Sequence, residues 1–92
     1  MSESDGKTRD LTEREAAFLL QLATNVKAAR EAKGLTSEKV AWQAGIDKGY
    51  MSRVESAQRA PTLLVLLKLA TALDVEPWEL LRPKPAPSEG TQ

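Results

Sequence analysis

The chain has 92 residues, a length that suits one compact domain. It contains neither cysteine nor histidine, which excludes a disulfide framework and a thiolate zinc site and removes the usual general base of enzymes. Thirteen basic residues balance thirteen acidic ones, so the net charge of zero gives no overall attraction to nucleic acid. From this composition we expect neither an enzyme nor a bound cofactor.

The first predicted element is a long helix that follows a polar tail. Residues 1–10 are polar and charged and lack apolar periodicity, so we predict a disordered tail there. Thr12 and Glu15 match the T-x-x-E capping box, in which two free helix donors are satisfied reciprocally, and Gly34 is placed to end the helix after Lys33. One stripe of this helix is apolar at three- and four-residue spacing: Leu19, Leu22, Ala23, Val26 and Ala29.

Two short helices follow, and a glycine separates them. Thr36 or Ser37 is placed to cap the first, and Gly45 ends it after barely two turns. Asp47 is placed to cap the second. The inward positions of the two helices are Val40, Ala41, Ala44, Met51 and Val54. The opposite side of the second helix is left facing out, with Lys48, Gly49, Ser52 and Arg53.

An apolar helix and a short final helix complete the predicted domain. Thr62 caps a helix that runs to Leu73, and a last helix begins around Pro77. The core face of the apolar helix is predicted to hold Leu63, Leu66, Leu67, Ala70 and Leu73. Residues 83–92 are rich in proline and are predicted to form a flexible tail. We therefore predict an all-α fold with five helices over residues 11–82 and no strand.

Residues 37–56 have the spacing of a helix-turn-helix motif. Such a motif needs a small residue where its helices cross and a glycine in the turn, which Ala41 and Gly45 supply. Counted from Ser37, apolar residues stand at the fourth, eighth, tenth, fifteenth and eighteenth places, so both helices pack on one core. An ordinary helical hairpin matches two or three of these places by chance, whereas the full set with a polar outer face is much rarer. The motif predicts binding to double-stranded DNA.

The distribution of charge agrees with this prediction. From Lys27 to Arg59 the chain carries seven basic and four acidic residues, a local balance of +3, and the remaining segments carry six basic and nine acidic residues. A basic centre between acidic ends places positive potential where phosphate would be attracted. On composition alone, a solvated charged face explains the pattern equally well.

Most of this chain resembles a known DNA-binding family. The XRE-type domain of phage Cro proteins and repressors is similar to the segment NVKAAREAKGLTSEKVAWQAGIDKGYMSRVESAQRAPTLLVLLKLATALDVEPWELL. This segment is about sixty of the 92 residues, and its specific blocks are KGLT, GIDKGYMSRVE, LLKLATAL and VEPWELL. The resemblance implies a five-helix lambda-repressor-like domain, here with an extended N-terminal helix. It also implies that the third helix enters the major groove, in a homodimer on a palindromic operator.

The resemblance also implies which residues read DNA. The base-reading positions of the family match Lys48, Gly49 and Arg53, and lysine and arginine donate well to guanine O6 and N7. Asp47 stands at the helix start, where capping and acceptance of a bond from cytosine are both open. Phosphate or base-edge contacts are assigned to Tyr50, Ser52 and Ser56. Plain solvent exposure is the alternative for all of these positions.

Three positions depart from the family pattern. Ser37 stands where the family commonly has a glutamine that bonds a phosphate and braces the recognition helix, and serine is too short to do both. Gly49 replaces a long polar side chain, which either allows close approach of the backbone to DNA or costs the helix about 1 kcal/mol. Ala57 stands where glycine usually ends the recognition helix.

An ion pair is implied between the first and third helices. Arg30 and Glu55 match a family salt bridge, which would orient the recognition helix from behind. Two independent surface charges are the alternative. We expect that removal of Glu55 destabilises the fold, because it leaves Arg30 unpaired.

The fourth predicted helix is apolar nearly all round, which predicts a second buried face. Leu64 and Val65 point away from the predicted core and occupy positions that are usually polar in the family. In a protein this small the available partner is another copy, so we predict a homodimer through the fourth and fifth helices. Trp78 and Leu81 are included in this interface, with closure of the monomer core as their alternative.

Trp42 occupies a position of the second helix that is normally polar in the family. The N-terminal helix extends about two turns beyond the family domain, with Phe18 and Leu20 beside its core stripe. Packing of this extension against the body would explain Trp42, and we favour it. The alternative places Trp42 beside a DNA strand, with its indole N–H bonded to a phosphate.

These observations together predict a small homodimeric DNA-binding regulator of transcription, located in the cytoplasm and associated with the nucleoid. The longest apolar run, Leu63–Leu67, is too short to span a bilayer, and MSESDGKTRD lacks the apolar core of a signal peptide. The alternative is an antitoxin or other protein-interaction module, which holds a partner protein through the N-terminal helix or the proline-rich tail and binds its own promoter. A helix-turn-helix adaptor that binds no DNA is the third interpretation, favoured by the zero net charge.

Overall fold

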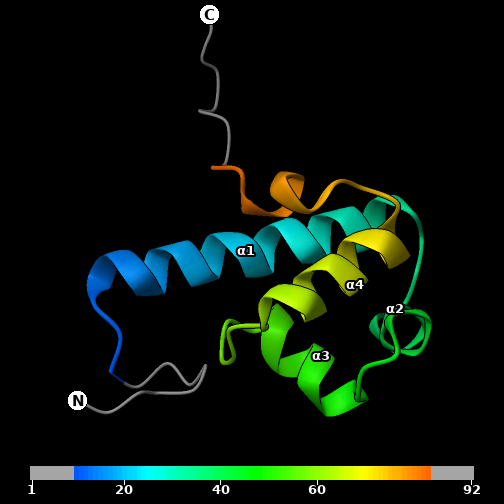
Figure 1. The fold of residues 1–92 in the computed structure, drawn as a ribbon, viewed down its shortest axis with the longest axis horizontal. Helices are drawn as coiled ribbons and strands as arrows, with labels where there is room; N and C mark the ends of the chain where they lie inside the picture. Colours follow the sequence, from blue (N-terminus) through cyan, green and yellow to red (C-terminus); the bar gives the residue numbers. More distant parts are fainter. Residues whose placement is uncertain (1–9, 84–92) are drawn as a thin grey trace, which may run out of the picture.

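A computed structural model describes residues 10–83 of the protein. In chain order, the elements are α1 (Glu13–Ala32), α2 (Ser37–Ala44), α3 (Lys48–Glu55), α4 (Leu63–Leu73) and the 3-10 helix η1 (Pro77–Leu81) (Figure 1). This part of the chain contains no strand, which confirms the all-α prediction. The predicted tails at 1–10 and 83–92 lie outside the described residues, apart from Asp10 and Pro83.

Side chains at the helix starts explain where the elements begin. The predicted capping box is present, because Thr12 Oγ1 accepts from the Glu15 N–H at 3.0 Å and Glu15 Oε1 accepts from the Thr12 N–H at 3.1 Å. Thr36, Asp47 and Thr62 cap α2, α3 and α4 through their side-chain oxygens. Each of these bonds satisfies a backbone donor that has no partner within its helix.

Each of the four α-helices of residues 10–83 is followed by a residue with left-handed backbone, which after α4 is Asp74 with a φ of +60°. Gly34 after α1 and Gly45 after α2 have φ values of +68° and +72°, as expected for glycines that end helices. Ala57 after α3 has a φ of +61°, and the Gln58 N–H donates to the Arg53 carbonyl at 2.8 Å. Ala57 therefore ends α3 in the conformation that glycine usually supplies, at a cost of about 1–2 kcal/mol for a residue with a Cβ.

The core lies where α3, α4 and η1 pack against α1, and where α2 packs against α3 and α4. α4 contacts α2, α1 and η1, and α3 contacts α2 and α1. Figure 1 shows η1 above α1, with α3 below it. The buried side chains of the described residues are all apolar, and the central ones are Val26, Val40, Met51, Val54, Leu69, Leu73 and Leu80.

The orientation of α4 differs from the prediction. Leu63 and Leu67, which were predicted in the core, are 80% and 48% exposed, whereas Leu69, which was not, is fully buried. α4 packs against α2 as well as against α1 and η1. Because of these contacts, α4 buries a different set of side chains, namely Leu66, Leu69, Ala70 and Leu73. Lys68 and Thr71 are both exposed and mark the outer face of α4, but the spacing of the leucines alone does not reveal this rotation and misplaced Leu63 and Leu67.

The fifth predicted helix is a 3-10 helix, so residues 10–83 contain four α-helices and not five. Pro77 at the first position of η1 has no N–H, and Arg82 is extended (φ −69°, ψ 143°) because Pro83 follows it. Only the five residues of η1 lie between these limits, which is too few for a run of α-helical hydrogen bonds.

An asparagine without any sequence signal holds η1 against α1. Asn25 Nδ2 donates to the carbonyl oxygens of Leu80 at 2.9 Å and Arg82 at 2.8 Å. Asn25 Oδ1 accepts from Gln21 Nε2 at 3.0 Å, which orients the amide. The C-terminal end of the domain is thereby fixed to the middle of α1.

Trp42 and the start of α1 do not pack together, so that prediction was wrong. Trp42 is 75% exposed on the outer face of α2, with Lys39 Nζ 5.3 Å from the centre of its ring. α1 begins at the end of the domain opposite α2 (Figure 1), so its first turns do not reach Trp42. Phe18 and Leu20 are exposed as well.

Candidate nucleic-acid interface

α2 and α3 pack against each other through apolar side chains. Met51 and Val54 of α3 are fully buried, as is Val40 of α2. The Ile46 N–H donates to the Ala41 carbonyl at 2.9 Å, which closes the turn between the helices. The inner faces of both helices are therefore fixed, and the outer side of α3 remains available.

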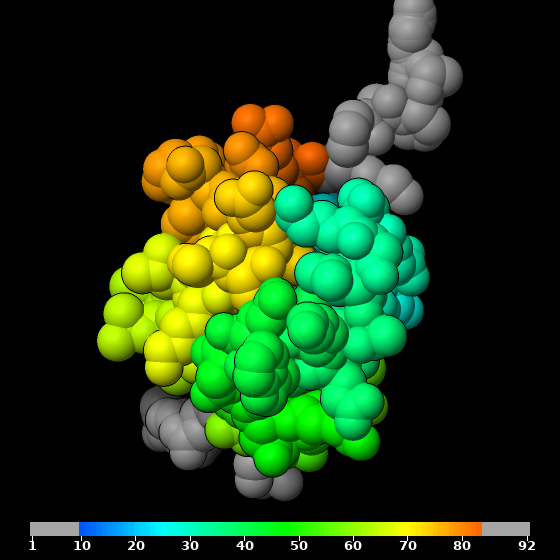
Figure 2. All heavy atoms as spheres, turned by 90° about the vertical axis from the view of Figure 1, so that its right-hand side faces the viewer, coloured from blue at the N-terminus to red at the C-terminus, as the bar shows by residue number. Residues whose placement is uncertain are grey.

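The outer side of α3 is polar. We call it the recognition face and define it by Lys48, Gly49, Ser52 and Arg53, of which all but the half-buried Gly49 are exposed. The other residues predicted to contact DNA belong to α2, to α3 or to the caps of α3, and they are Ser37, Asp47, Tyr50 and Ser56. Figure 2 looks onto the outer side of α2, whose atoms adjoin those of α3 and α4.

Asp47 is held as the N-cap of α3. Its Oδ2 accepts from the N–H groups of Gly49 at 2.8 Å and Tyr50 at 3.3 Å. A Cβ on residue 49 would lie 2.9 Å from this oxygen, closer than side chains tolerate, and 3.6 Å from Arg53 Nη1. Gly49 therefore makes room for the capping carboxylate, whereas a Cβ there would make only an ordinary contact with the Arg53 guanidinium. Sequence reasoning missed this role of Gly49.

Lys48 is paired with an acidic residue of α2. Its Nζ lies 3.1 Å from Glu38 Oε2, and both side chains are largely exposed. An exposed pair of this kind contributes about 0–1 kcal/mol, because water solvates both charges. Lys48 therefore exchanges Glu38 for another anion at little cost.

Tyr50 joins the recognition helix to the loop that follows it. Its hydroxyl accepts from the Thr62 N–H at 3.3 Å, at the start of α4. The Arg59 guanidinium lies over the Tyr50 ring, 5.3 Å from the ring centre, and Arg59 Nε is buried with no hydrogen-bond partner. Arg59 is thus a cation held beside α3. The sequence did not predict this position, because Arg59 lies in a loop, where no helical spacing applies.

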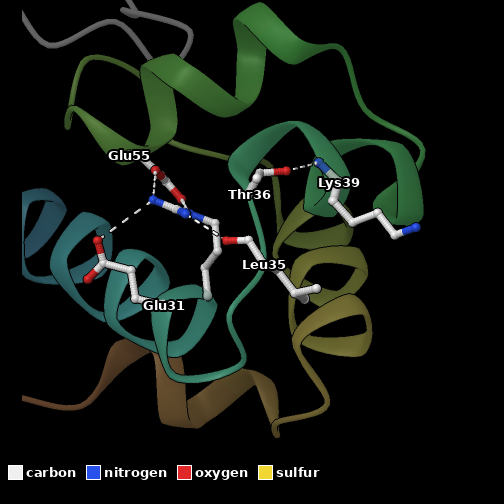
Figure 3. Close-up of polar contacts among 6 residues, drawn as sticks. Glu31, Leu35, Thr36, Lys39 and Glu55 are labelled. Carbon is white, nitrogen blue, oxygen red and sulfur yellow. Dashed lines mark hydrogen bonds and ion pairs between the residues drawn. The ribbon is translucent and has the colours of Figure 1, made fainter.

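Arg30 and Glu55 form the ion pair that the family resemblance implied (Figure 3). Arg30 Nε and Nη2 donate to the two Glu55 oxygens at 2.7 and 3.2 Å, and Arg30 Nη1 donates to the Leu35 carbonyl at 2.8 Å. The hydrogen bonds to Glu55 favour the charged form of Arg30 and raise its pKa, against the opposing effect of burial. α3 is thereby tied to α1 and to the loop before α2.

A polar hollow lies where α1, α2 and α3 meet. It is lined by Lys27, Ser37, Ser52, Glu55 and Ser56. Three of the predicted contact residues, all serines, are thus brought together, and Lys27 adds a positive charge that sequence reasoning counted but did not place at the site. The Glu55 charge is already balanced by Arg30. Among the residues that the structure describes, the hollow therefore combines hydroxyl donors with one cation, Lys27, that forms no ion pair, a set that suits an oxyanion.

The sequence matches the family described as Helix-turn-helix over residues 26–80, which is more than half of the chain. The chain is a member of the XRE-type helix-turn-helix family. Proteins of this family are DNA-binding regulators of transcription, which is not a class of enzymes. The first half of α1 lies outside the matched range.

Relatives of this XRE-type protein are named as regulators. It is 37% identical over 71 residues to the uncharacterised HTH-type transcriptional regulator y4dJ of Sinorhizobium fredii, over 77% of this chain and 92% of that protein. Its structure resembles that of the restriction-modification controller protein C.AhdI from Aeromonas hydrophila with a TM-score of 0.68 and 45% identity, over 70% of this chain and 97% of that one. The hypothetical transcription factor NHTF from Neisseria gives a TM-score of 0.70 and 31% identity, over 87% and 91% of the two chains.

The four residues predicted for the dimer interface of the XRE-type domain divide into two groups. Leu64 and Trp78 are exposed, whereas Val65 and Leu81 are half-buried and pack against the core. The exposed apolar side chains of α4, which we call the α4 stripe, are Leu63, Leu64 and Leu67.

Within residues 10–83, no helix is long and apolar enough to cross a membrane. Over the same residues, no group of three or more acidic, histidine or cysteine side chains is placed to hold a metal ion.

Proposed function

We propose that this protein is a sequence-specific regulator of transcription that binds a palindromic DNA operator as a homodimer, with α3 in the major groove. One observation supports this most strongly: the recognition face stands on a helix whose opposite face, through Met51 and Val54, is fully buried. The major groove of B-form DNA admits one α-helix, and base edges are read by polar side chains on such a helix. α3 offers both a polar outer side and a fixed orientation.

Arg53 and Lys48 are the side chains that we assign to base readout. Both are exposed and cationic, and a guanine presents two acceptors, O6 and N7, in the major groove. Lys48 would leave Glu38 for the base, and Gly49 would let the start of α3 approach the base pairs closely. Asp47 is engaged as the cap of α3, so we assign it a positioning role only.

Phosphate contacts on the two sides of α3 would set its depth in the groove. On one side, the polar hollow offers Lys27 and the hydroxyls of Ser37, Ser52 and Ser56. On the other side, the Arg59 guanidinium lies over the Tyr50 ring and adds a second positive charge. Contacts of this kind carry no sequence information, but they supply most of the affinity and fix the register of the protein.

The homodimer would form through the α4 stripe. Leu63, Leu64 and Leu67 are exposed on one helix, although large contiguous apolar patches are rare on monomeric proteins. A two-fold axis pairs a patch with itself and gives two recognition helices, so the operator would be a palindrome with half-site centres about 34–36 Å apart. We keep Trp78 as a peripheral contact, because it is exposed on η1.

The named relatives favour a regulator of the controller type. C.AhdI, at 45% identity over nearly its whole length, is a restriction-modification controller protein. A regulator bound to DNA in this way would be associated with the nucleoid in the cytoplasm. The interpretation as an antitoxin with a separate protein partner stays a prediction.

Selection of bound sequences from a random pool of double-stranded DNA tests this proposal. The expected result is an inverted repeat with one helical turn between half-site centres. Binding to the selected site should weaken steeply with salt, by about 0.9 log units per released counterion per log unit of salt concentration. A pool without any enriched sequence, together with binding that ignores salt, would contradict the proposal and favour an adaptor.

A further inference from the structure

The first turns of α1 overhang the domain and form one wall of an apolar hollow. α1 extends beyond the start of α4 in Figure 1, toward the side away from α2. Below the overhang lies a hollow that we call the arm hollow, lined mainly by Leu11, Phe18, Leu22, Pro61, Leu63 and Leu81. Its only charged lining residue is Glu15. The hollow thus offers an apolar surface to something outside residues 10–83.

Phe18 forms a ridge beside this hollow. It is 55% exposed, and it lines both the arm hollow and a second hollow that includes Arg14, Gln21 and Pro83. Transfer of a large aromatic side chain in this position from water into an apolar contact lowers the free energy. The same short segment therefore carries both a projecting apolar group and a depression able to receive one.

The remaining residues of the chain lack the side chains to fill the arm hollow. Residues 1–9, MSESDGKTR, contain one large apolar residue, Met1, and residues 84–92, KPAPSEGTQ, contain none. Burial of apolar surface needs an apolar partner, because polar side chains lose hydration there without gaining hydrogen bonds. The occupant must therefore bring its own apolar group.

We propose that a second copy of this chain occupies the arm hollow, so that the N-terminal turns of α1 act as an arm in the dimer. This inference rests on the homodimer of the proposed function and assigns it a further contact. Phe18 of each copy enters the hollow of its partner, as a two-fold axis requires of a surface that pairs with itself. The opposite charges of Arg14 and Glu15, which line the two hollows beside Phe18, suit this exchange.

Two features connect the arm with the rest of the proposed dimer. Leu63 belongs both to the arm hollow and to the α4 stripe, so the two surfaces are continuous. None of the residues lining the hollow belongs to the recognition face or to the polar hollow, so the pairing leaves α3 free for DNA. Phe18 precedes the family match at residues 26–80, so the arm adds a contact outside the family domain.

Sedimentation equilibrium of two matched variants tests the arm. Phe18→Glu places a charge in the proposed contact, and we expect it to raise the dimer dissociation constant at least tenfold. Leu20→Glu is the control, because Leu20 is on the same helix and is 59% exposed but lines neither hollow. Its dimer dissociation constant should match that of the unsubstituted protein. Both variants should keep the melting temperature of the monomer, measured at protein concentrations below the dimer dissociation constant, because the replaced side chains are exposed.

Disulfide trapping provides a second test that does not depend on dimer stability. The chain has no cysteine, so Phe18→Cys and Leu63→Cys can each be made as single-cysteine proteins and mixed under oxidising conditions. We expect a covalent heterodimer from this mixture and far less from Leu20→Cys mixed with Leu63→Cys, since a disulfide needs Cα atoms within about 7 Å.

The outcomes separate the arm from the dimer itself. If Phe18→Glu dimerises like the unsubstituted protein while Leu64→Glu does not, the arm is overturned and the homodimer through the α4 stripe stands. If the unsubstituted protein binds its operator as a monomer, both the arm and the homodimer are overturned, and the DNA-binding part of the proposed function stands.

Discussion

The outer faces of α3 and α4 differ in kind, although their inner faces are alike. Met51 and Val54 on α3 are fully buried, and so are Leu69 and Leu73 on α4. The exposed residues of α3 include Lys48, Ser52 and Arg53. The exposed apolar residues of α4 are Leu63, Leu64 and Leu67. The fold needs only the inner faces, so the outer faces are free to differ, and under the proposed function α3 meets nucleic acid and α4 meets a second copy of the chain.

The largest effect is expected when α3 is released from α1. Glu55→Ala removes the carboxylate that accepts from Arg30 Nε at 2.7 Å and leaves a mostly buried guanidinium with only the exposed Glu31 carboxylate, 4.0 Å away, as a counterion among the described residues. We expect a loss of about 3 kcal/mol in the free energy of unfolding, measured by urea denaturation. If the orientation of the recognition face depends on the Arg30–Glu55 pair, DNA affinity falls as well, even though Glu55 is not on the recognition face.

The controls for this prediction compare two ion pairs of different exposure. Lys33→Ala breaks the exposed pair with Asp74, whose charged atoms are 3.8 Å apart, and should cost less than about 1 kcal/mol. The pKa of Arg30 is raised in the folded state. The stability that its charge contributes to folding is therefore fully present below the pKa of the unfolded state and is lost only as pH rises through the pKa of the folded state. The effect of Glu55→Ala should therefore be constant between about pH 6 and 9. If Glu55→Ala and Lys33→Ala lower the free energy of unfolding equally, the Arg30–Glu55 pair does not anchor α3 to α1.

The α4 stripe provides the next largest expected effect. Leu64→Glu combined with Leu67→Glu introduces two charges into the proposed interface, and we expect the dimer dissociation constant to rise about 100-fold, or about 2.8 kcal/mol. Trp42→Glu is the control, because Trp42 is also apolar and exposed but lies on α2. Sedimentation velocity measures both. A dimer that survives the double substitution would show that the outer face of α4 has another purpose.

The contrast between α3 and α4 also explains how much of the fold was predictable. In α3, polar residues mark the outer face, so spacing assigned Met51 and Val54 correctly to the core. In α4, leucines occupy both sides, so the same rule placed Leu63 inside although it is 80% exposed. Caps at Thr12 and Thr62 were predictable because capping depends on a few neighbouring residues, whereas the rotation of α4 depends on its contacts with three other elements.

Removal of a single base-reading side chain is expected to have a smaller effect. Arg53→Ala should weaken binding to the selected operator by about 1–3 kcal/mol and leave binding to random DNA nearly unchanged. Lys68→Ala is the matched control, because it removes an exposed cation from α4. Fluorescence anisotropy with both DNAs measures the ratio. If Arg53→Ala weakens both equally, Arg53 contacts phosphate and not a base.

The sequence indicated which elements carry the predicted contact residues, whereas most contacts among their side chains were not predictable from it. Spacing and resemblance place the contact residues on α3 and its neighbours because those elements are local in the sequence. The pairing of Lys48 with Glu38, and the position of Arg59 over Tyr50, join residues nine or more positions apart, through side chains with several rotamers. No spacing rule reaches that far, because the outcome depends on how the turn and the loop are folded.

The smallest expected effect concerns Gly49, where two opposing contributions nearly cancel. Gly49→Ala should gain up to about 1 kcal/mol from helix propensity, but its Cβ would lie 2.9 Å from Asp47 Oδ2 and disturb a cap worth about 0.5–2 kcal/mol. The net change in unfolding free energy should therefore be small. In an Asp47→Ala background the carboxylate is gone, and the same substitution should then stabilise the protein by the full propensity gain. A double-mutant cycle measures this difference as a coupling energy between the two positions. A coupling near zero would mean that Gly49 does not make room for the cap, and close approach to DNA would remain as the reason for glycine on the recognition face.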